Sequence, residues 1–586
     1  MIEWLHNLPP GIIMIAGALL LPFVGKKGSA YGALALSIVS LGVFWFTPTG
    51  EYGNIELFGN SLNLVRIDSL SRIFGLIFHL AAVMASIYAL HVEDTKQHIS
   101  GMIYAGGAIG AACAGDLITL FVFWELTAIS SVFLVWASKT ERSYRSGMRY
   151  LIIQVTSGVL LLSGAIIHAH QTGSIAFDHL HGLKWGETAS IWDMGLGPQL
   201  ILLAFGIKCA FPLLHNWLQD SYPEATPTGT VFLSAFTTKL AIYSLARGFS
   251  GTEELITIGC AMTLFPIVFA VIENDLRRVL AYSLNNQLGF MVVGVGIGTE
   301  LAINGTAAHA FCHIIYKALL FMSMGAVLYR VGTTKATELG GLHKSMPWTT
   351  VFCIIGAGAI SGFPLLSGFV SKSMIITAAA EQHMFWVWIV LLIASAGVME
   401  HSGIKIPFFA FFAHDSGKRV KEAPWNMLMA MSIAASLCVG LGIFYPVLYN
   451  LLPSKPMAMH DGHLEPYKPY TTAHVVTMLQ LLAFAALAFV FLMKAKLYPA
   501  EIRSTNLDTD WTYRKLLPWV LGGLGAAISF FDTNARKGFV AGLKNFLEGA
   551  RNTFDERGSL GRTTSTSAMA VWAALLLGIC LLLYYL

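Results

Sequence analysis

The sequence predicts an all-α polytopic membrane protein, and two observations lead to this fold class. First, 55% of the 586 residues are hydrophobic and only 12% are charged, whereas soluble domains carry roughly 25% charged residues. Second, about seventeen apolar stretches are each long enough for a helix that crosses the hydrocarbon core, which takes about 20 residues. The mean hydropathy of +0.64 agrees with both observations. Most side chains of this protein are therefore predicted to face lipid or the interior of a helix bundle.

The predicted spans follow one another with short connections. They lie near residues 8–25, 30–47, 70–92, 100–116, 117–137, 147–168, 197–218, 228–248, 254–272, 278–298, 302–329, 348–379, 383–412, 425–450, 471–495, 514–532 and 566–586. The first apolar run has no basic start and no small-residue cleavage site, so it is predicted to be a retained helix. Residues 50–66 alternate in polarity between Gly and Asn turns and predict a short extramembrane hairpin. Residues 1–99 thus form an N-terminal section of helices and one hairpin.

Basic residues are concentrated in alternate loops. They are Lys26, Lys27, Lys139, Arg142, Arg145, Arg149, Arg277, Arg278, Lys418, Arg419 and Lys421. Short cytoplasmic loops of membrane proteins carry an excess of Lys and Arg. The basic loops are therefore predicted to face the cytoplasm of a bacterium or archaeon, with the N-terminus and the hairpin outside the cell membrane.

The C-terminal part divides into predicted core helices at 425–495 and an extension at 500–586. In residues 534–556 the apolar side chains share one helical face and Lys and Arg the opposite face, which is typical of a helix lying on a membrane or on a partner. These basic residues favour the cytoplasm, whereas alternation after a span at 514–532 places them outside. Either that span does not fully cross, or the charge rule fails here. A terminal transmembrane helix completes the extension.

Ionisable side chains inside the spans are the strongest functional signal, since each costs roughly 2.5–3.5 kcal/mol near the bilayer centre. Glu125 lies well inside its apolar run, Lys208 lies near the middle of its span, and Lys239 is central in the next one. Pro212 follows Lys208 by one turn and removes a helical hydrogen bond, so this span is predicted to be broken. Such charged groups persist only when they are paired or line a hydrated cavity, and we take them as candidate functional residues.

A second set of ionisable residues follows. His309, His313 and Lys317 are spaced i, i+4 and i+8 and so share one helix face. The two histidines alone are equally well explained as packed core residues, but a lysine one turn further favours a relay. Lys372 lies in a second Gly/Pro-interrupted span. Lys405 comes late in its span, so snorkelling to the interface is a serious rival to a buried role.

Groups of this kind can pass protons. Burial disfavours the charge of a lysine and a nearby carboxylate favours it, so that its two protonation states can be brought close in energy. A row of Lys and His groups with water between them is therefore suited to move protons along the membrane plane. A purely scaffolding role leaves the cost of the buried charges unexplained.

Other chemistry has no support in the sequence. The seven cysteines lie inside apolar runs, without a CxxC or a Cys/His cluster, so no disulfide, metal site or redox cofactor is predicted. The net charge of +4 is diffuse and no separate basic stripe is present, so no nucleic-acid partner is predicted.

The interrupted spans recur at corresponding positions. The broken span with Lys208 is followed by a span with Lys239, and five spans later the broken span with Lys372 is followed by one with Lys405. Such pairs of interrupted helices indicate an inverted-repeat transporter. The predicted five-helix repeats are residues 100–248 and 254–412. Only the first contains a carboxylate at the Glu125 position, because Asn285, Asn286 and Gln287 stand in the matching span.

Several segments in order resemble the antiporter-like subunits shared by respiratory complex I, group 4 membrane-bound hydrogenases and Mrp-type cation/proton antiporters. They are FVFWELTAISS, KCAFPLLHNWLQDSYPEATPT, ENDLRRVLAYSLNNQLGFM, HAFCHIIYKALLF and SGFPLLSGFVSK. The resemblance implies about fourteen core helices with two inverted five-helix units. It implies that Glu125 and Lys208 form the coupling pair of the family. The other proton-path positions of the family fall on Lys239, His309, His313, Lys317 and Lys372.

Within this family, TTKLAIYSLA and ASAGVMEHSGIKIPFFAFF, which contains Lys405, look most like the D subunit of Mrp-type antiporters. The resemblance therefore implies a proton-translocating component of a multisubunit Na⁺/H⁺ antiporter, with other membrane subunits and lipid around it and H⁺ and Na⁺ as transported ions. Beyond about residue 500 the chain departs from the shorter members of that group. Two alternatives stay open: a proton-pumping subunit of a complex I-like or hydrogenase complex, and a membrane subunit for inorganic-carbon uptake. The chain is predicted to be a transporter subunit, and a translocase only when a redox partner drives it.

Overall fold

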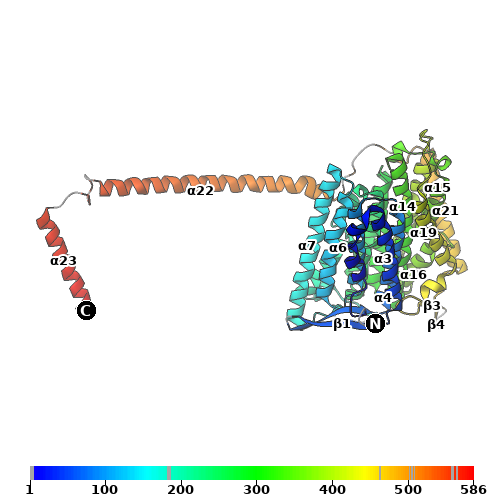
Figure 1. Cartoon of the computed structure of the whole chain (residues 1–586), viewed down its shortest axis with the longest axis horizontal. Helices are drawn as coiled ribbons and strands as arrows, with labels where there is room; N and C mark the ends of the chain where they lie inside the picture. The colour runs from blue at the N-terminus through cyan, green and yellow to red at the C-terminus, as the bar shows by residue number, and fades with distance from the viewer. Residues whose placement is uncertain are drawn as a thin grey trace. The chain divides into compact units, whose positions relative to one another are not determined.

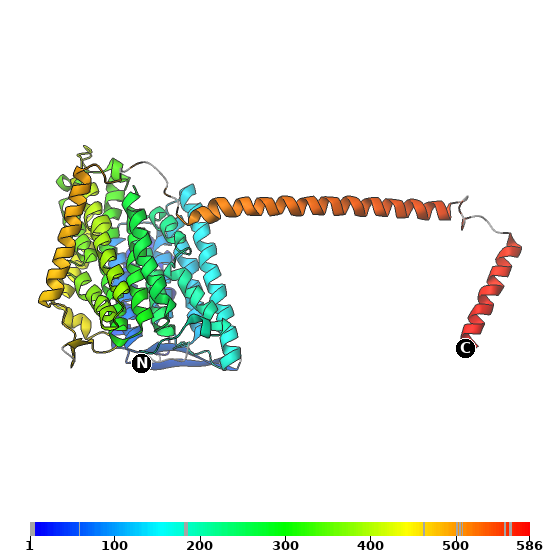
Figure 2. The same ribbon diagram turned by 180° about the vertical axis from the view of Figure 1, so that it is seen from behind.

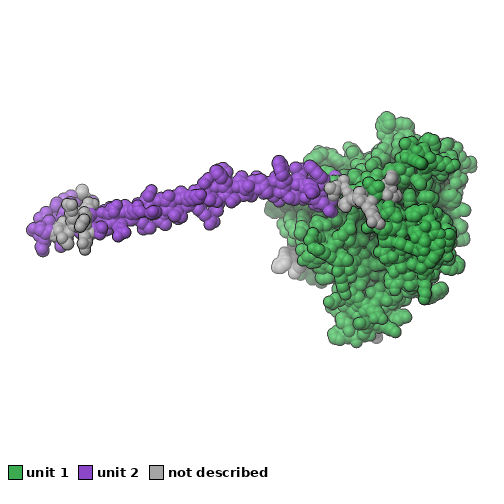
Figure 3. Space-filling model, turned by 90° about the horizontal axis from the view of Figure 1, so that it is seen from above, with its two compact units in different colours: residues 1–508 green, residues 509–586 purple. Residues whose placement is uncertain are grey.

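The computed structural model describes residues 6–57, 59–180, 186–460, 463–499, 502, 506, 508–555, 558, 560–561 and 565–585. Contacts divide the chain into two compact units, Met1–Asp508 and Thr509–Leu586, which Figure 3 shows in different colours. Within the described residues, 12 helices are long and apolar enough to cross a membrane, and the apolar helices α8 and α15 are shorter. The predicted all-α polytopic membrane fold is confirmed (Figures 1 and 2).

The N-terminal section begins with two short helical segments that turn back into a long helix. Helix α2 (Ile12–Ala18) and a 3₁₀ turn (Leu21–Val24) precede α3 (Gly25–Phe46). The reversal between them uses Gly25 at φ +72°, a conformation that glycine adopts without steric cost. The predicted hairpin is present as β1 (Gly50–Leu57) and β2 (Asn60–Ile67), paired antiparallel from Gly50↔Ile67 to Leu57↔Asn60. Figure 1 shows the hairpin at the same end of the bundle as the N-terminus.

Helices of the first predicted repeat follow α4 (Ser69–Tyr88). They are α5 (Thr95–Ala112), α6 (Leu117–Trp136), α7 (Glu141–Thr172), α8 (Leu196–Cys209), α9 (Asn216–Ser221), α10 (Pro227–Ala235) and α11 (Thr237–Gly248). The predicted break beside Lys208 is present between α8 and α9, with Ala210 and Leu213 at positive φ. The predicted span at 100–116 ends earlier, because Asp116 caps the start of α6 by accepting from the amides of Ile118 and Thr119.

One break was not predicted. Residues 228–248 read as a single span, yet the structure has α10 and α11 separated at Phe236. No proline or glycine causes this break. Instead the hydroxyl of Tyr104 on α5 accepts a hydrogen bond from the Thr237 amide at 3.0 Å and replaces a helical carbonyl. The predicted span at 228–248 is present as a candidate membrane crossing, but the break within it could not be predicted because it depends on a distant side chain.

Helices of the second predicted repeat contain a matching break and two π-helical turns. They are α12 (Glu254–Ile272), α13 (Leu276–Ile297), α14 (Glu300–Val331), α15 (Pro347–Ser361), α16 (Ser367–Glu381), α17 (Phe385–Val398) and α18 (Lys405–Pro407). The break between α15 and α16 has Gly362 and Leu365 at positive φ. The π-helical turns, Met399–Ile404 and Phe408–Phe412, flank Lys405. π-helical turns are frequent at functional sites.

The remaining core elements are α19 (Trp425–Ile443), α20 (Tyr445–Tyr449), a hairpin of β3 (Met457–His460) and β4 (His463–Pro466), and α21 (Thr472–Lys494). Residue 500, where the extension was predicted to begin, lies outside the described residues. In the second unit a π-helical turn (Thr512–Leu516) leads into α22 (Leu517–Phe554), and α23 (Thr566–Tyr585) follows as the predicted terminal helix.

Helix α22 corrects one prediction. The span at 514–532 and the amphipathic helix at 534–556 were predicted as separate elements, but residues 517–554 form one helix of 38 residues, drawn as an uninterrupted rod in Figure 1. At 1.5 Å per residue it is about 57 Å long, well beyond a hydrocarbon core of about 30 Å. The change in polarity near Asp532 misled the prediction, because polarity alone does not end a helix without a cap, Gly or Pro.

The bundle has two chemically different ends. One end, here called the basic face, comprises residues 26–27, 137–149, 216–226, 273–278, 332–346 and 413–424. Ion pairs join these segments: Arg142 to Glu224 at 2.9 Å and Lys344 to Asp415 at 2.9 Å. At the opposite end the hairpin is fixed to the core, where the Arg66 amide donates to the Cys113 carbonyl. The predicted basic loops therefore gather at the end opposite the hairpin.

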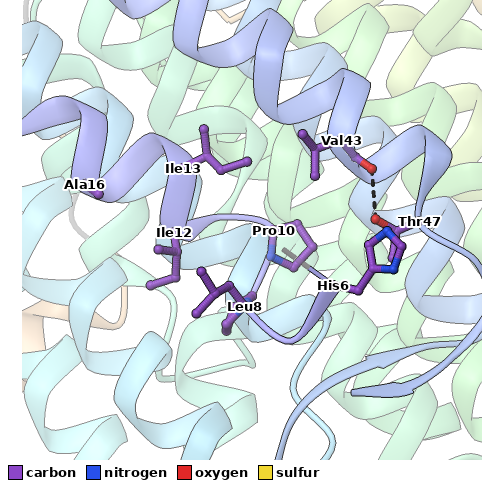
Figure 4. Close-up of a pocket in the computed structure, with 9 residues that line it drawn as sticks. His6, Leu8, Pro10, Ile12, Ile13, Ala16, Val43 and Thr47 are labelled. Atoms are coloured by element: carbon purple, nitrogen blue, oxygen red, sulfur yellow. Dashed lines mark hydrogen bonds between the residues drawn. The ribbon is translucent and has the colours of Figure 1, made fainter. Parts of the chain in front are cut away.

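A cavity of about 180 Å³ lies at the N-terminal turn, between the residues around Pro10 and the end of α3. Figure 4 shows its lining, in which the Thr47 hydroxyl already donates to the Val43 carbonyl at 2.8 Å. His6 supplies the other polar side chain. This cavity contains none of the predicted ion-path residues.

Candidate functional site

The predicted ionisable residues lie inside the core unit. Seven of them have 0% exposed side chains: Lys208, Lys239, His309, His313, Lys317, Lys372 and Lys405. Glu125 is half-buried. Snorkelling of Lys405 to the interface, the rival interpretation of that residue, does not occur.

The predicted Glu125–Lys208 pair is not in direct contact in the described structure. The Lys208 ammonium donates to the carbonyl of Trp124 at 2.6 Å and to the Thr127 hydroxyl at 3.1 Å. It also lies 4.3 Å from the centre of the Trp124 ring, a favourable cation–π position. The charges of Glu125 and Lys208 still act on each other. The two groups thus act on each other electrostatically while their side chains contact different residues.

Gly158 on α7 makes the space that Glu125 occupies. An ideal Cβ built on Gly158 lies 1.5 Å from Glu125 Oε1, which no real contact allows. This oxygen is buried and has no hydrogen-bond partner among the described residues. Buried carboxylate oxygens are normally hydrogen-bonded, so Glu125 is a group that must recruit water or a moving partner.

Three of the lysines bind carbonyls at the ends of helix segments. Lys239 donates to Ser234 at 2.5 Å, beside the break after α10, and Lys372 donates to Ile360 at 2.7 Å, in the last turn of α15. Lys405 donates to the carbonyls of Val271 and Glu273, each at 2.7 Å, at the end of α12. Terminal carbonyls lack helical partners and carry partial negative charge. The breaks therefore create acceptor sites that hold an ammonium group inside the membrane.

The histidine face of α14 is connected to both neighbouring helices. His309 Nδ1 lies 3.0 Å from the Ser371 hydroxyl on α16, and its Nε2 lies 3.4 Å from the Tyr316 hydroxyl. Tyr316 in turn donates to the Gln287 side chain at 3.2 Å. Gln287 belongs to the segment that replaces the carboxylate in the second repeat, so an amide takes part in the network there. Sequence reasoning missed Ser371, Tyr316 and Gln287, because only packing brings them to His309.

The buried ionisable residues named above form what is here called the row. Two residues in its middle have no hydrogen-bond partner among the described residues. Both ring nitrogens of His313 and the ammonium nitrogen of Lys317 are buried without a hydrogen-bond partner in the described part of the chain. His401, in the first π-helical turn, is also 0% exposed, and its imidazole has the backbone of Gly397 as a hydrogen-bond partner. Its charge environment includes Lys317, Lys372 and Lys405. His401 therefore joins the row, and its spacing one turn before Lys405 was the signal that could have identified it.

Buried ionisable groups of the two repeats are near enough to act on one another electrostatically. Lys239 acts electrostatically on Cys209 beside Lys208, and it also acts on Lys317. Lys317 is likewise a neighbour of Lys372. Within the residues that the structure describes, no group of three or more His, Cys, Asp or Glu side chains could hold a metal ion. The arrangement is suited to transfer of protons between titratable groups.

Comparisons with known proteins find a matching family model and several related membrane subunits. Residues 114–397 match the family described as NADH:quinone oxidoreductase/Mrp antiporter, TM. The D subunit of the Na(+)/H(+) antiporter of Alkalihalophilus pseudofirmus is 28% identical over 439 residues, covering 69% of this chain and 86% of that protein. Hydrogenase-4 component B of Escherichia coli is 26% identical over 462 residues, covering 71% of this chain and 66% of that protein.

A solved structure shares the fold. A chain in the structure of the Mrp complex from Dietzia sp. DQ12-45-1b superposes with a TM-score of 0.75 at 21% identity, covering 98% of this chain and 62% of that one. Because the first unit ends at residue 508 of 586, a match of this coverage includes most of the second unit. This chain is shorter than that relative and than the hydrogenase component, spanning about two thirds of each.

The fold and the buried row define a polytopic, antiporter-like membrane subunit. Residues 114–397 match the NADH:quinone oxidoreductase/Mrp antiporter transmembrane family, and the resemblance predicted from the sequence is confirmed.

Proposed function

We propose that this chain is the proton-translocating antiporter-like subunit of a multisubunit cation/proton antiporter, with Na⁺ as the exchanged cation. The observation that carries the proposal is the buried row, in which ammonium groups sit at helix breaks and the central groups lack protein partners among the described residues. The relative from Alkalihalophilus pseudofirmus is a Na⁺/H⁺ antiporter component, and its match covers most of this chain. The partners are other membrane subunits of the same complex.

The proposed route begins at Lys208 or Lys239, crosses the central His/Lys face, and ends near Lys372 or Lys405. Each lysine can rest as an ammonium on a helix-end or backbone carbonyl and release its proton to water between the groups. The unpartnered nitrogens of His313 and Lys317 require hydrogen bonds that water supplies. Hydrated histidine and lysine groups then exchange protons along the membrane plane.

In this proposal Glu125 determines the direction in which protons move along the row. At this position a carboxylate stands only in the first repeat, and it acts on the charge of Lys208. When Glu125 is ionised it stabilises the ammonium form of Lys208, and when it moves away or is neutralised it favours release of the proton. In the second repeat Asn285, Asn286 and Gln287 stand in the matching span, so Lys372 has no carboxylate at this position. The basic face is proposed to be cytoplasmic and the hairpin extracytoplasmic, in a bacterial or archaeal cell membrane.

Displacing the Glu125 carboxylate tests the proposed function. In the complex reconstituted into liposomes, Glu125→Ala is expected to lower cation-driven proton movement about 100-fold, since loss of a proton-transfer group typically costs 10²–10⁴-fold. Gly158→Ala keeps the carboxylate but forces it from its place, and we expect a loss of at least about tenfold. Gly42→Ala is the matched control, because a Cβ there meets nothing within 4 Å. Wild-type transport by an assembled Glu125→Ala complex contradicts the proposal.

A redox-driven complex is the second candidate, favoured by the match to hydrogenase-4 component B over 71% of this chain. The proton route is then the same, but electron transfer in a partner drives it. Subunit analysis of the purified complex separates the two. Small membrane subunits without redox centres support the antiporter, whereas iron–sulfur subunits support the redox complex.

A further inference from the structure

Asp508, the last residue of the core unit, places a carboxylate beneath the basic face. Its side chain is only 2% exposed although the residue lies at the surface. The carboxylate accepts from the Tyr282 hydroxyl at 2.8 Å and from the Asn216 side-chain amide, and its Oδ2 lies 3.2 Å from His215 Nε2. One carboxylate thus joins the start of α9 in the first repeat to α13 in the second.

His215 lies in the break of the helix that bears Lys208. Its side chain is 1% exposed, and its ring packs against Phe265 with centroids 4.6 Å apart. The indole of Trp217 donates to the Ile207 carbonyl at 2.9 Å and so ties α9 to the last turn of α8 beside Lys208. His215 Nδ1 is buried without a hydrogen-bond partner among the described residues. The imidazole therefore has one nitrogen on a carboxylate and one available.

The charge state of this group follows from its contacts. Burial by itself raises the pKa of the Asp508 carboxyl, but hydrogen bonds from His215, Tyr282 and Asn216 together with the charge of His215 lower it to about 2. The carboxylate is then ionised at neutral pH and can only accept hydrogen bonds. The proton of neutral His215 must lie on Nε2, which leaves a lone pair on Nδ1.

Other charged groups at this place belong to α13 and to the turn before it. Arg278 and Glu273 both act on Tyr282 from the basic face. Glu273 also accepts from the Asn506 side chain at 3.3 Å, in the same segment as Asp508. Positive and negative charges are thus both present around the carboxylate, and Asp508 is the one in hydrogen-bond contact with His215.

We propose that His215 is a proton-relay residue at the mouth of the path to Lys208, and that Asp508 is the positioning residue that holds it. This inference rests on the proposed proton transport. A hydrated proton at the basic face is passed to Nδ1 and leaves a neutral water behind, and the imidazolium is stabilised by Asp508. The same nitrogen then returns the proton to a water further inward, which restores neutral His215, while the Nε2 proton stays on the Asp508 hydrogen bond throughout.

Asp508 comes from outside the part that defines the family. The family match ends at residue 397, whereas Asp508 immediately precedes the second unit. The segment between α21 and α22 therefore supplies a residue to the core that the family shares. A relay of this kind is a property of the longer chain, and the imidazole itself is supplied by the core.

The first test removes the imidazole. In liposomes containing the complex, His215→Ala is expected to lower proton transport about 30-fold, and added imidazole at millimolar concentration is expected to restore at least a third of the rate. Rescue by a small proton carrier is a response that a merely structural histidine does not give. Unchanged transport, or a loss that imidazole does not restore in an assembled complex, overturns the relay.

The second test removes the charge and keeps the shape. Asp508→Asn retains an oxygen that accepts from Tyr282, and we expect about a tenfold loss of transport, because the imidazole loses the carboxylate that orients it and the imidazolium loses its counter-charge. Asp510→Asn is the matched control, since that carboxylate pairs with Arg514 at 2.6 Å within the second unit. Equal effects of the two variants overturn the role of Asp508. If the His215→Ala complex does not assemble, transport by the Asp508→Asn complex tests the relay instead.

Lys208→Ala separates failure of this inference from failure of the proposed function. If Lys208→Ala abolishes transport and His215→Ala does not, the relay is wrong and the proton path stands. If Lys208→Ala also transports at the wild-type rate, the proposed function and the relay both fall.

Discussion

Replacing Lys317 with methionine is expected to lower proton transport about 100-fold, a typical effect of losing a proton-transfer group, while the melting temperature of the complex stays unchanged or rises. Lys317 is central in the row and its ammonium nitrogen has no hydrogen-bond partner in the described structure. Exchange of a buried ionisable group for an apolar one of similar size is often neutral or stabilising. Proton flux in liposomes and thermal unfolding of the same preparation measure both effects.

This combination distinguishes function from packing. If Lys317 were a structural residue, its loss would lower the melting temperature and leave transport by the surviving complex intact. That result contradicts proton transfer through Lys317. Phe321, whose ring lies 6.0 Å from the Lys317 ammonium, offers a control: Phe321→Leu keeps the lysine and is expected to retain most of the transport.

In contrast to the loss of Lys317, the loss of Lys405 is expected to destabilise the protein. Lys405→Met removes donors from the carbonyls of Val271 and Glu273 at the end of α12. Leaving buried acceptors unpaired costs about 1–3 kcal/mol each, so we expect a destabilisation of about 3 kcal/mol, seen as a lower melting temperature, together with loss of transport.

Lys405→Arg separates the two roles of this side chain. Arginine still donates to the α12 carbonyls but does not release its proton in proteins. We expect the variant to recover most of the stability and little of the transport. Recovery of both shows that Lys405 only caps α12 and does not pass protons.

Much of the fold followed from the sequence because the signals were local. Pro212 and Pro364 predicted the two broken helices, since proline removes a backbone donor wherever it stands. The alternation of apolar runs and basic loops predicted the spans and the gathering of basic residues at one end. The spacing of His309, His313 and Lys317 alone predicted their common helix face.

The parts that failed depend on contacts between distant residues. The break at Phe236 exists because Tyr104, from another helix, takes the Thr237 amide, and no local pattern contains that information. Likewise, Lys208 was expected to meet Glu125, but its flexible side chain bonds to the Trp124 carbonyl instead. The sequence predicts which charged residues share a helix face, but tertiary packing determines which atoms their side chains contact.

The contact between His215 and Asp508 could not be predicted from the sequence for the same reason. His215 lies in the segment KCAFPLLHNWLQDSYPEATPT that resembles the family, but Asp508 lies 293 positions later in a segment that carries no transport motif. Only the return of the chain to the basic face joins them. The long helix α22 was divided in two for a related reason, since its change in polarity resembles an end.

The most direct test of the central claim is a cryo-EM map of the complex at a resolution that shows ordered water. We predict water density within about 2.7–3.2 Å of both ring nitrogens of His313, of the Lys317 ammonium and of His401, continuing toward Lys239 and Lys372. A map in which these atoms meet protein donors and acceptors, or lie in dry apolar packing, contradicts proton transfer along this row.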